Sequence, residues 1–321
     1  MIIVTGGAGF IGSCVVRTLN NYGIEDILIV DNIASTDKWI NIRNKRYIKY
    51  VNKIDFLNKL SGYKDVTAII HMGAQSSTVE KNFDYLWINN FEYTKTLWEY
   101  CAEKNIRFIY ASSAATYGDG TQGFDDKSDI DQLTPLNGYA YSKQLFDQWV
   151  KHQATVFPKQ HVGLKFFNVY GPNEYYKGCM ASMIFHGFGQ IQKDGEIRLF
   201  RSYVPKYKDG EQLRDFIYVK DICNVIFWLL ENPNVNGLFN VGTGKAQSFN
   251  ELAEAIFSAL GINPHIRYID MPEELQQKYQ YFTEAKMDKL RAEGYTKDFS
   301  TLKEGVTDYV QNYLLKCYQT Y

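Results

Sequence analysis

Tyr139 and Lys143 stand four residues apart, a spacing that could support proton transfer. If this segment is helical, positions i and i+4 share a face, so the phenol and the ammonium can point at the same spot. A cation near a phenol favours the phenolate and lowers its pKa from about 10. We therefore expect Tyr139 to accept a proton near neutral pH if a nucleotide site and a hydroxyl donor surround it. The ordinary alternative is a pair of helical side chains covering the edge of a core.

A glycine-rich segment near the start of the chain predicts a nucleotide site. The short apolar run at residues 2–4 leads directly into Thr5-Gly6-Gly7-Ala8-Gly9-Phe10-Ile11-Gly12. Glycines permit a tight turn and a close approach of phosphate, and the following helix offers its first N–H groups. A second strand-like run, residues 27–30, ends at Asp31, where an acid can bind the adenosine ribose. The order strand, loop, helix, strand and acid predicts a dinucleotide site.

The residues around Asp31 leave the choice of dinucleotide open. A carboxylate at this position suits the free 2′-hydroxyl of NAD. However, Asn32 follows, and Lys38 and Lys53 are close enough in sequence to bring positive charge to the 2′-phosphate of NADP. Both lysines could equally be solvated surface residues, which is the commoner fate of lysine.

Two further strands are expected to end at the site. Residues 66–71 read as a buried strand, in which His71 is a packing residue, and residues 72–77 form the loop at its carboxyl end. Ligands bind at such ends in open α/β sheets. A long helix then passes through Asn89, and the strand at residues 108–113 ends in Ser113. The Ser113 hydroxyl could hydrogen-bond a substrate alcohol beside Tyr139.

The composition excludes several classes of function. The 321 residues carry a net charge of -1, so there is no broad basic field to attract nucleic acid or an anionic membrane. The five cysteines are scattered and no His/Cys cluster occurs, so we expect no metal site and no disulfide framework. No apolar run approaches the ~18 residues of a membrane span. We expect a soluble cytoplasmic protein.

Four motifs together resemble a known family. Thr5-Gly6-x-x-Gly9-x-x-Gly12, Ser112-Ser113-x-x-x-Tyr117-Gly118, Tyr139-x-x-x-Lys143 and the run at residues 214–219 resemble the extended short-chain dehydrogenase/reductases that act on nucleotide sugars. Residues 110–118, 167–172, 177–182, 280–283 and 294–295 are similar to those of the ADP-L-glycero-D-manno-heptose 6-epimerases of lipopolysaccharide core synthesis. The resemblance implies a Rossmann-type doubly wound parallel sheet with a smaller C-terminal substrate-binding lobe. Residues 1–165 would form the NADP-binding domain, with later segments crossing back, and residues 166–321 would mainly form the lobe.

The resemblance also implies a reaction. C6 of the heptose in ADP-D-glycero-β-D-manno-heptose would be oxidised to a 6-keto sugar and reduced again on the opposite face. Tyr139 and Lys177 would exchange protons with the sugar from opposite sides. Lys143 would orient the cofactor ribose and lower the pKa of Tyr139, and Ser113 would polarise the oxygen. The resemblance implies NADP, with NAD as the alternative, a nucleotide-sugar substrate, no metal and a homopentamer.

The resemblance assigns the remaining contacts. The cofactor contacts are Gly6, Gly9, Phe10, Ile11, Gly12, Asp31, Asn32, Lys38, Lys53, Met72, Gly73, Ala74, Gln75, Ser76, Asn89, Lys143, Val169 and Lys177. The substrate contacts are Ser113, Asn168, Cys179, His186, Phe200, Arg201, Ser202, Tyr203, Arg214 and Tyr279. Cys179 stands where the family often has serine, and we expect no cysteine chemistry there. Residues 316–321 look like a frayed end.

Two other kinds of function remain open beside another nucleotide-sugar epimerase. One is a nucleotide-sugar 4,6-dehydratase of the same superfamily. That chemistry resembles members that have an Asp-Glu pair just after the position of Ser113, where this chain has Ala114 and Ala115. A non-catalytic module that senses the cofactor usually lacks the tyrosine or the lysine, and Tyr139 and Lys143 are both present.

Overall fold

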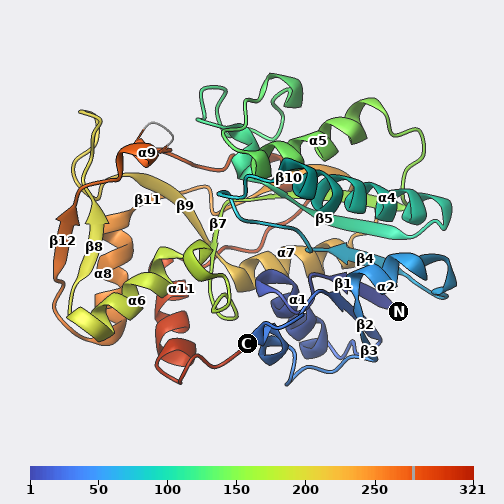
Figure 1. The fold of residues 1–321 in the computed structure, drawn as a ribbon, viewed down its shortest axis with the longest axis horizontal. Helices are drawn as coiled ribbons and strands as arrows, with labels where there is room; N and C mark the ends of the chain where they lie inside the picture. Colours follow the sequence, from blue (N-terminus) through green and yellow to red (C-terminus); the bar gives the residue numbers. More distant parts are fainter. Residues whose placement is uncertain (277–278) are drawn as a thin grey trace.

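A parallel sheet of seven strands forms the larger part of the protein (Figure 1). The computed structural model describes residues 1–276 and 279–321. The strand order is β10 (Gly237–Val241), β6 (Gln160–Phe166), β5 (Arg107–Ser113), β4 (Ala68–His71), β1 (Ile2–Thr5), β2 (Ile27–Asp31) and β3 (Lys49–Asn52). Every pairing in this sheet is parallel. The predicted Rossmann-type sheet is confirmed.

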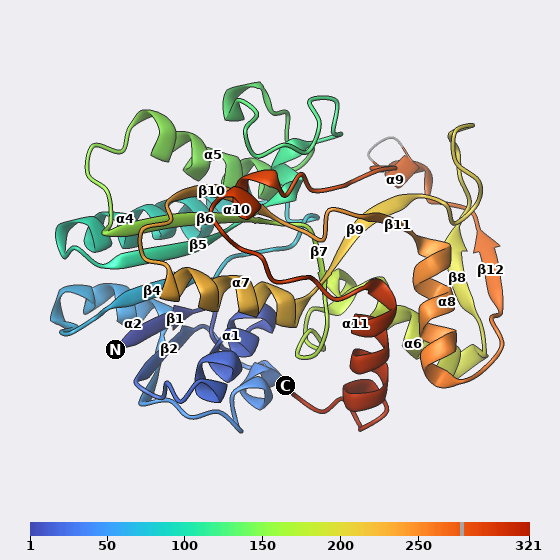
Figure 2. The same cartoon turned by 180° about the vertical axis from the view of Figure 1, so that it is seen from behind.

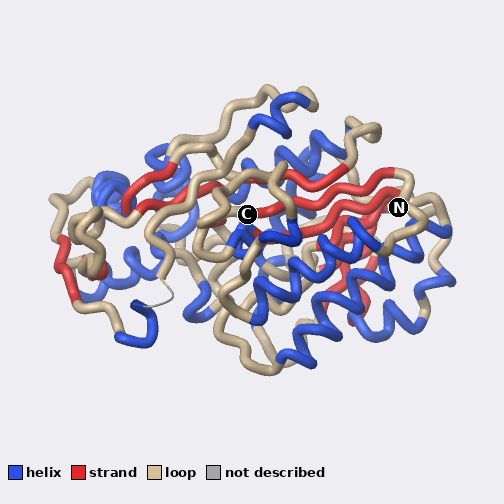
Figure 3. The backbone as a smooth tube through the Cα atoms, turned by 90° about the horizontal axis from the view of Figure 1, so that it is seen from above, coloured by secondary structure: helices blue, strands red, loops and turns tan. Residues whose placement is uncertain are grey.

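Helices cover both faces of this sheet (Figures 1 and 3). Helices α1 (Phe10–Asn21) and α7 (Val219–Glu231) lie on one face, and α4 (Tyr93–Glu103) and α5 (Gly138–His152) on the other. Because strand side chains alternate, Val4 packs in one core with Val15 of α1, whereas Ile3 packs in a second core with Trp98 of α4. Burial on both faces explains why these strands are apolar throughout.

Shorter helical segments complete this half of the chain. Helix α2 (Lys53–Asn58) follows β3, and α3 (Phe83–Leu86) continues through a π-helical segment (Trp87–Glu92) into α4. The strand β5 runs into a 3₁₀ turn (Ala114–Tyr117). Lys53 at the start of α2 and Asn89 in the π-helical segment line the site described below.

A smaller lobe lies beside the large sheet (Figure 2). It contains a three-stranded sheet and a two-stranded sheet, joined with short helices. The strands are β7 (Asn168–Tyr170), β9 (Leu213–Tyr218) and β11 (Ala246–Ser248), and β8 (Ile197–Phe200) with β12 (Ile266–Ile269). The helices are α6 (Met183–Asp194), α8 (Phe249–Leu260), α9 (Glu273–Gln276) and α11 (Leu302–Tyr309), which a π-helical segment (Val310–Leu314) follows. Helix α10 (Asp288–Ala292) returns to the large sheet, where Lys289 Nζ donates to the Leu238 carbonyl oxygen of β10 at 2.7 Å.

Helix α8 has a defined cap at each end. It begins with a capping box between Ser248 and Glu251 and ends at Gly261, whose backbone is left-handed with φ +70°. Within the two described ranges, no helix is both long and apolar enough to cross a bilayer.

The end of the chain is anchored, so the expectation of a frayed end over residues 316–321 is wrong. The Tyr321 N–H donates to Asn173 Oδ1 at 2.9 Å, and Lys45 Nζ donates to the Tyr321 carbonyl oxygen at 2.6 Å. The Tyr318 ring packs against Tyr175 with centroids 5.6 Å apart. The end of the chain therefore lies against α1 and the loop after β7, which Figure 2 shows from behind. These contacts join segments far apart in sequence, so the local pattern did not reveal them.

Candidate active site

The glycine-rich loop joins β1 to α1 and packs closely against the loop after β4. Gly6 has φ +65°, and a Cβ there would lie 2.6 Å from the backbone nitrogen of Gly73. Only glycine permits this close approach of the first and fourth strand ends. The N-cap of α1 is Gly9, which has no side chain to satisfy the free N–H groups of the first turn. These groups can therefore bind an anion such as a phosphate.

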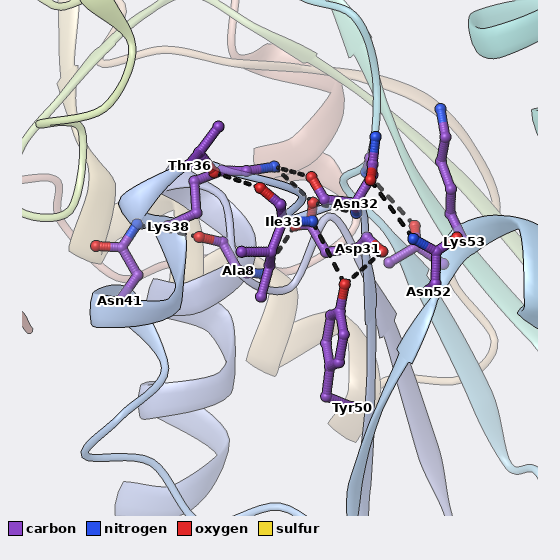
Figure 4. A network of polar contacts seen from close by, with 12 residues as sticks. Ala8, Asp31, Asn32, Ile33, Thr36, Lys38, Asn41, Tyr50, Asn52 and Lys53 are labelled. Atoms are coloured by element: carbon purple, nitrogen blue, oxygen red, sulfur yellow. Dashed lines mark hydrogen bonds and ion pairs between the residues drawn. The ribbon is translucent and has the colours of Figure 1, made fainter.

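Asp31 ties this loop to the end of β2 (Figure 4). Its Oδ2 accepts the Ala8 N–H at 2.9 Å, and its Oδ1 accepts the Asn32 N–H at 2.7 Å. Lys38 Nζ lies 2.7 Å from the same Oδ1 and also donates to the Asn32 carbonyl oxygen at 2.8 Å. The carboxylate thus positions the glycine loop and holds one of the two lysines considered above.

A cavity of about 210 Å³ opens beside Asp31. Lys38 and Lys53 both line it, and Lys53 Nζ donates to the side-chain oxygen of Asn89. Asp31 contributes one negative charge and the two lysines two positive charges, so these groups sum to +1 around the cavity. The lysines are therefore not merely solvated surface residues.

A second cavity of about 500 Å³ adjoins the first and contains the proposed chemistry. Ser113 at the end of β5 and Tyr139 and Lys143 on α5 all line it. Helix α5 begins here because the Asn137 side chain caps it, accepting the Ala140 N–H at 2.9 Å. Tyr139 and Lys143 therefore occupy the first two turns and share a face, as their spacing predicts.

The expected lowering of the Tyr139 pKa by Lys143 is wrong for this structure. Burial raises the pKa of Tyr139, and a hydrogen bond with the Ser113 hydroxyl only partly opposes that rise. The Lys143 ammonium donates instead to the Ala111 carbonyl oxygen at 2.9 Å, and burial lowers its own pKa to about 8. Desolvation outweighs the attraction that the four-residue spacing suggested, and Tyr139 is a neutral phenol at pH 7.

Lys177 enters the same cavity from the loop after β7. Its Nζ lies 5.3 Å from the centroid of the Phe10 ring, at the start of α1. Burial lowers the pKa of Lys177, and the nearby Glu174 carboxylate opposes that shift. Glu174 is itself buried and accepts the Ser182 N–H at 2.6 Å and the Ser182 hydroxyl at 2.7 Å. These two hydrogen bonds hold together the segments on either side of Lys177.

The structure brings the predicted cofactor contacts together. All of them line one or both cavities: Gly6, Gly9, Phe10, Ile11, Gly12, Asp31, Asn32, Lys38, Lys53, Met72, Gly73, Ala74, Gln75, Ser76, Asn89, Lys143, Val169 and Lys177. Their contact with a cofactor stays a prediction. Of the predicted substrate contacts, Ser113 lines the larger cavity.

Arg214 forms the centre of a second group of predicted substrate contacts, in the smaller lobe. Its guanidinium lies 5.1 Å from the centroid of the Tyr279 ring, and the Phe200 ring packs on Tyr279 at 6.4 Å. Arg214 is 7% exposed and donates to the backbone oxygens of Leu213 and Gln280. Among residues 1–276 and 279–321, no carboxylate forms an ion pair with it. A buried guanidinium that donates to carbonyl oxygens and has no carboxylate partner in the described ranges suits an anionic ligand.

The other predicted substrate contacts are more scattered. Arg201, Ser202 and Tyr203 follow Phe200 at the end of β8, where Tyr203 donates to Asp270 at 3.2 Å. Asn168 and Cys179 are exposed, and His186 lies on α6 beside Phe185. None of these residues lines either cavity, so their roles stay predictions.

Sequence reasoning missed the residues that hold the site together. Asn90 accepts the Gln75 N–H at 2.8 Å and donates to Ser142 Oγ at 2.9 Å, so it joins the loop after β4 to α5. Asn173 donates to Ser13 Oγ at 2.8 Å and so joins the Lys177 loop to α1. Its positive φ of 75° after Gly171-Pro172 marks a turn, but its partners are distant in sequence.

Comparison with known proteins places the chain in a family. Residues 2–242 match the NAD dependent epimerase/dehydratase family. The chain belongs to this family. Membership confirms the prediction of a nicotinamide-dependent enzyme of the epimerase/dehydratase class, with the motifs of the extended short-chain dehydrogenase/reductases.

Individual relatives are similar over nearly their whole length. The ADP-L-glycero-D-manno-heptose-6-epimerase of Fusobacterium nucleatum subsp. nucleatum is 52% identical, with 98% of each chain covered. The protein of that name from Nitratidesulfovibrio vulgaris strain DP4 is 55% identical, also with 98% of each chain covered. The crystal structure of the Helicobacter pylori ADP-L-glycero-D-manno-heptose-6-epimerase has a TM-score of 0.80 at 27% identity, and the match covers 97% of this chain and 95% of that one.

Burial of Lys143 predicts an effect on stability. Its pKa is about 8 in the folded chain, against 10.5 for a lysine in water, so the protonated form costs free energy in the folded state at pH 7. We expect Lys143→Met to raise the free energy of unfolding by roughly 1–3 kcal/mol at pH 7 in the absence of cofactor. Between pH 8 and 10.5 the Lys143 amine is mostly protonated in the unfolded wild type and mostly neutral in the folded one. Wild-type stability therefore rises with pH over this range, and the advantage of the variant shrinks.

Urea denaturation at pH 7 and pH 9.5 would measure both effects. Lys151→Met, on an exposed part of the same helix, is the matched control and should not gain stability. A Lys143→Met variant that is no more stable at pH 7, or whose gain is the same at both pH values, would contradict the buried ammonium.

Proposed function

We propose that this protein inverts C6 of the heptose in ADP-D-glycero-β-D-manno-heptose, giving the ADP-L-glycero-β-D-manno-heptose used for the lipopolysaccharide core. The observation that carries the proposal is one cavity lined by the glycine loop, by Ser113 with Tyr139, and by Lys177. Two groups able to exchange protons near one cofactor site suit an epimerase, which must handle both configurations of one carbon. The names of the relatives at 52% and 55% identity support the sugar.

The residues present fit a nicotinamide dinucleotide. The loop has no Cβ at Gly6, where one would meet Gly73, and α1 presents uncapped N–H groups for the pyrophosphate. Lys143 would hold the nicotinamide ribose, and Asp31 with its lysines would hold the adenosine end. When bound, the nicotinamide supplies the site that takes hydride from C6 and later returns it. The protein's part is to move the protons and to turn the sugar.

The two proton-handling residues suit opposite steps, since one can accept a proton and the other can donate one. The pKa of Lys177 is lowered by burial, which favours the free amine, so Lys177 suits removal of the C6 hydroxyl proton. The pKa of Tyr139 is raised by burial, so the phenol keeps a proton that it can give to the oxygen of the 6-keto sugar. Ser113 polarises that oxygen. Its Oγ accepts the Ala115 N–H at 3.1 Å, so its own proton remains available toward Tyr139 and the substrate. In the reverse direction the two residues exchange roles.

The smaller lobe would bind the rest of the substrate. Arg214 suits the diphosphate because a guanidinium donates two hydrogen bonds in fixed geometry. Phe200 and Tyr279 would pack beside it, and Arg201, Ser202 and Tyr203 would border the nucleotide. We assign the cofactor to residues 1–165 with later segments crossing back, and the substrate mainly to residues 166–321. We further propose a cytoplasmic homopentamer that needs no metal.

A 4,6-dehydratase is the weaker candidate. Elimination of water needs an acid near the reacting carbon, and the 3₁₀ turn after Ser113 begins instead with Ala114 and Ala115.

Incubation with the purified substrate tests the reaction and the role of Tyr139. Wild type should convert ADP-D-glycero-β-D-manno-heptose to an equilibrium mixture of C6 epimers, seen by product NMR. Tyr139→Phe keeps the ring but loses the proton relay, so turnover should fall by roughly 10²–10⁴ with cofactor binding retained. Tyr141→Phe, at an exposed position of the same helix, is the control and should stay near wild type. An unchanged substrate with wild type would reject the reaction, and near-normal turnover of Tyr139→Phe would remove this residue from it.

We propose NADP as the cofactor, with NAD as the alternative. Lys38 neutralises Asp31, and Lys53 leaves a net positive charge around the smaller cavity, which suits a 2′-phosphate. Replacing Lys38 and Lys53 together by alanine should therefore weaken NADP binding far more than NAD binding. Dissociation constants of both cofactors would be measured for wild type, for the double variant and for Lys49→Ala, an exposed lysine on β3 that should change neither. A wild type that prefers NAD, or an equal change for both cofactors, would contradict this choice.

A further inference from the structure

A buried ion pair lies beneath the strand that ends at Ser113. Lys165 Nζ on β6 is 3.2 Å from Asp147 Oδ2 on α5, with both side chains at most 1% exposed. Asp147 stands four residues after Lys143 and eight after Tyr139, so all three lie along one face of α5. Neither member of the pair lines the two cavities, so neither can touch substrate or cofactor there.

Both members of the pair have further hydrogen-bond partners within the protein. Asp147 accepts the Ser112 hydroxyl at 2.6 Å on Oδ2 and the Tyr110 hydroxyl at 3.1 Å on Oδ1. Lys165 donates to Thr116 Oγ1 at 2.5 Å. Tyr110 and Ser112 are both on β5, and Ser112 is the register partner of Lys165 on β6. The carboxylate therefore joins one helix to two adjacent strands.

Three consecutive residues of β5 contact three turns of α5. The Ala111 carbonyl accepts from Lys143, the Ser112 hydroxyl donates to Asp147, and the Ser113 hydroxyl lies close enough to Tyr139 to lower the pKa of that phenol. If the Ser112 contact is lost, the helix can shift along the strand and take Tyr139 and Lys143 with it. A displacement of ~1 Å in a reacting group can cost about 10²-fold in rate.

Stability alone does not explain such a pair. Two charges lose much of their attraction to desolvation when they are buried, and apolar residues of similar volume often do as well or better. Apolar residues at these two positions would not fix the position of α5 on β5, and they would not place a negative charge near Lys143.

We propose that Asp147 and Lys165 are positioning residues for the reaction, fixing the register of α5 on β5 and holding a negative charge beneath the Lys143 ammonium. The proposal rests on the proposed function for its kinetic readout, but its geometric part can be tested without it.

The charges around Lys143 define the expected pH effect. It shares a face of α5 with Asp147 and Tyr139, and it lies near neutral His71 on β4, whose pKa burial lowers to about 3; Lys165 of β6 pairs with Asp147. Burial lowers the pKa of Lys143 to about 8, and Asp147 opposes that shift. Without the Asp147 charge the ammonium loses its proton at a lower pH, so the alkaline limb of kcat/KM should move to lower pH.

The decisive variant is Asp147→Asn with Lys165→Met, which removes both charges together and leaves no unpaired buried ion. We expect kcat to fall by roughly 10- to 100-fold with a smaller change in KM, and the alkaline limb to move to lower pH. The single variant Lys165→Arg keeps a cation paired with Asp147, so it should retain most of the wild-type kcat and the wild-type pH profile of kcat/KM. The control, Lys220→Met with Asp308→Asn, removes an ion pair between α7 and α11 that lines neither cavity and should change neither quantity.

A kcat within threefold of wild type with an unchanged pH profile would overturn the proposal, as would an equal loss in the control. If the double variant does not fold, Ser112→Ala with Tyr110→Phe decides the question, because the two changes together remove both hydroxyl contacts between β5 and Asp147 and leave the ion pair in place. A fall in kcat at unchanged thermal stability supports the proposal, and an unchanged kcat rejects it.

A wild type inactive on the ADP-heptose would reject the proposed function instead. A crystal structure of the variant would then decide: a lost hydrogen bond from Lys143 Nζ to the Ala111 carbonyl oxygen supports the positioning role, and an unchanged one rejects it.

Discussion

The free-energy cost of burying lysine ammonium groups is the constraint on which this site depends. Lys143 and Lys165 are buried and Lys177 is half-buried, and burial lowers the pKa of each. The protein compensates each one differently. Lys143 has the Ala111 carbonyl, Lys165 has Asp147, and Lys177 has the more distant Glu174. Lys165 stays paired as part of the framework, whereas the lowered pKa of Lys177 favours the neutral amine that proton removal requires.

The fold makes this arrangement possible by covering both faces of a parallel sheet. The apolar cores on the two sides fix α1 and α5 relative to the strand ends, so the glycine loop and Tyr139 meet at one edge. The smaller lobe adds Arg214, a buried cation without a carboxylate partner in the described part of the chain. The same physical rule then applies to a ligand: a desolvated guanidinium gains most from an anion that supplies the missing charge.

Local spacing was enough to predict the parts of the site that lie within one element. The glycine loop, the acid at the end of β2 and the shared face of Tyr139 and Lys143 follow from short patterns, and the Rossmann-type fold follows from their order. The pKa direction of Tyr139 could not be predicted, because it depends on burial and on a carbonyl 32 residues from Lys143. The Asp147–Lys165 pair and the anchored Tyr321 were missed for the same reason, since both depend on contacts between distant segments.

The central claim is that hydride leaves C6 and returns to the same carbon while Tyr139 and Lys177 handle only oxygen-bound protons. The most direct measurement uses ADP-D-glycero-β-D-manno-heptose with deuterium at C6, converted by wild type in ordinary water and analysed by NMR and mass spectrometry. The account predicts that the epimerised product keeps its deuterium at C6. Loss of deuterium from C6 to the solvent would show that the carbon itself is deprotonated, and would contradict the account.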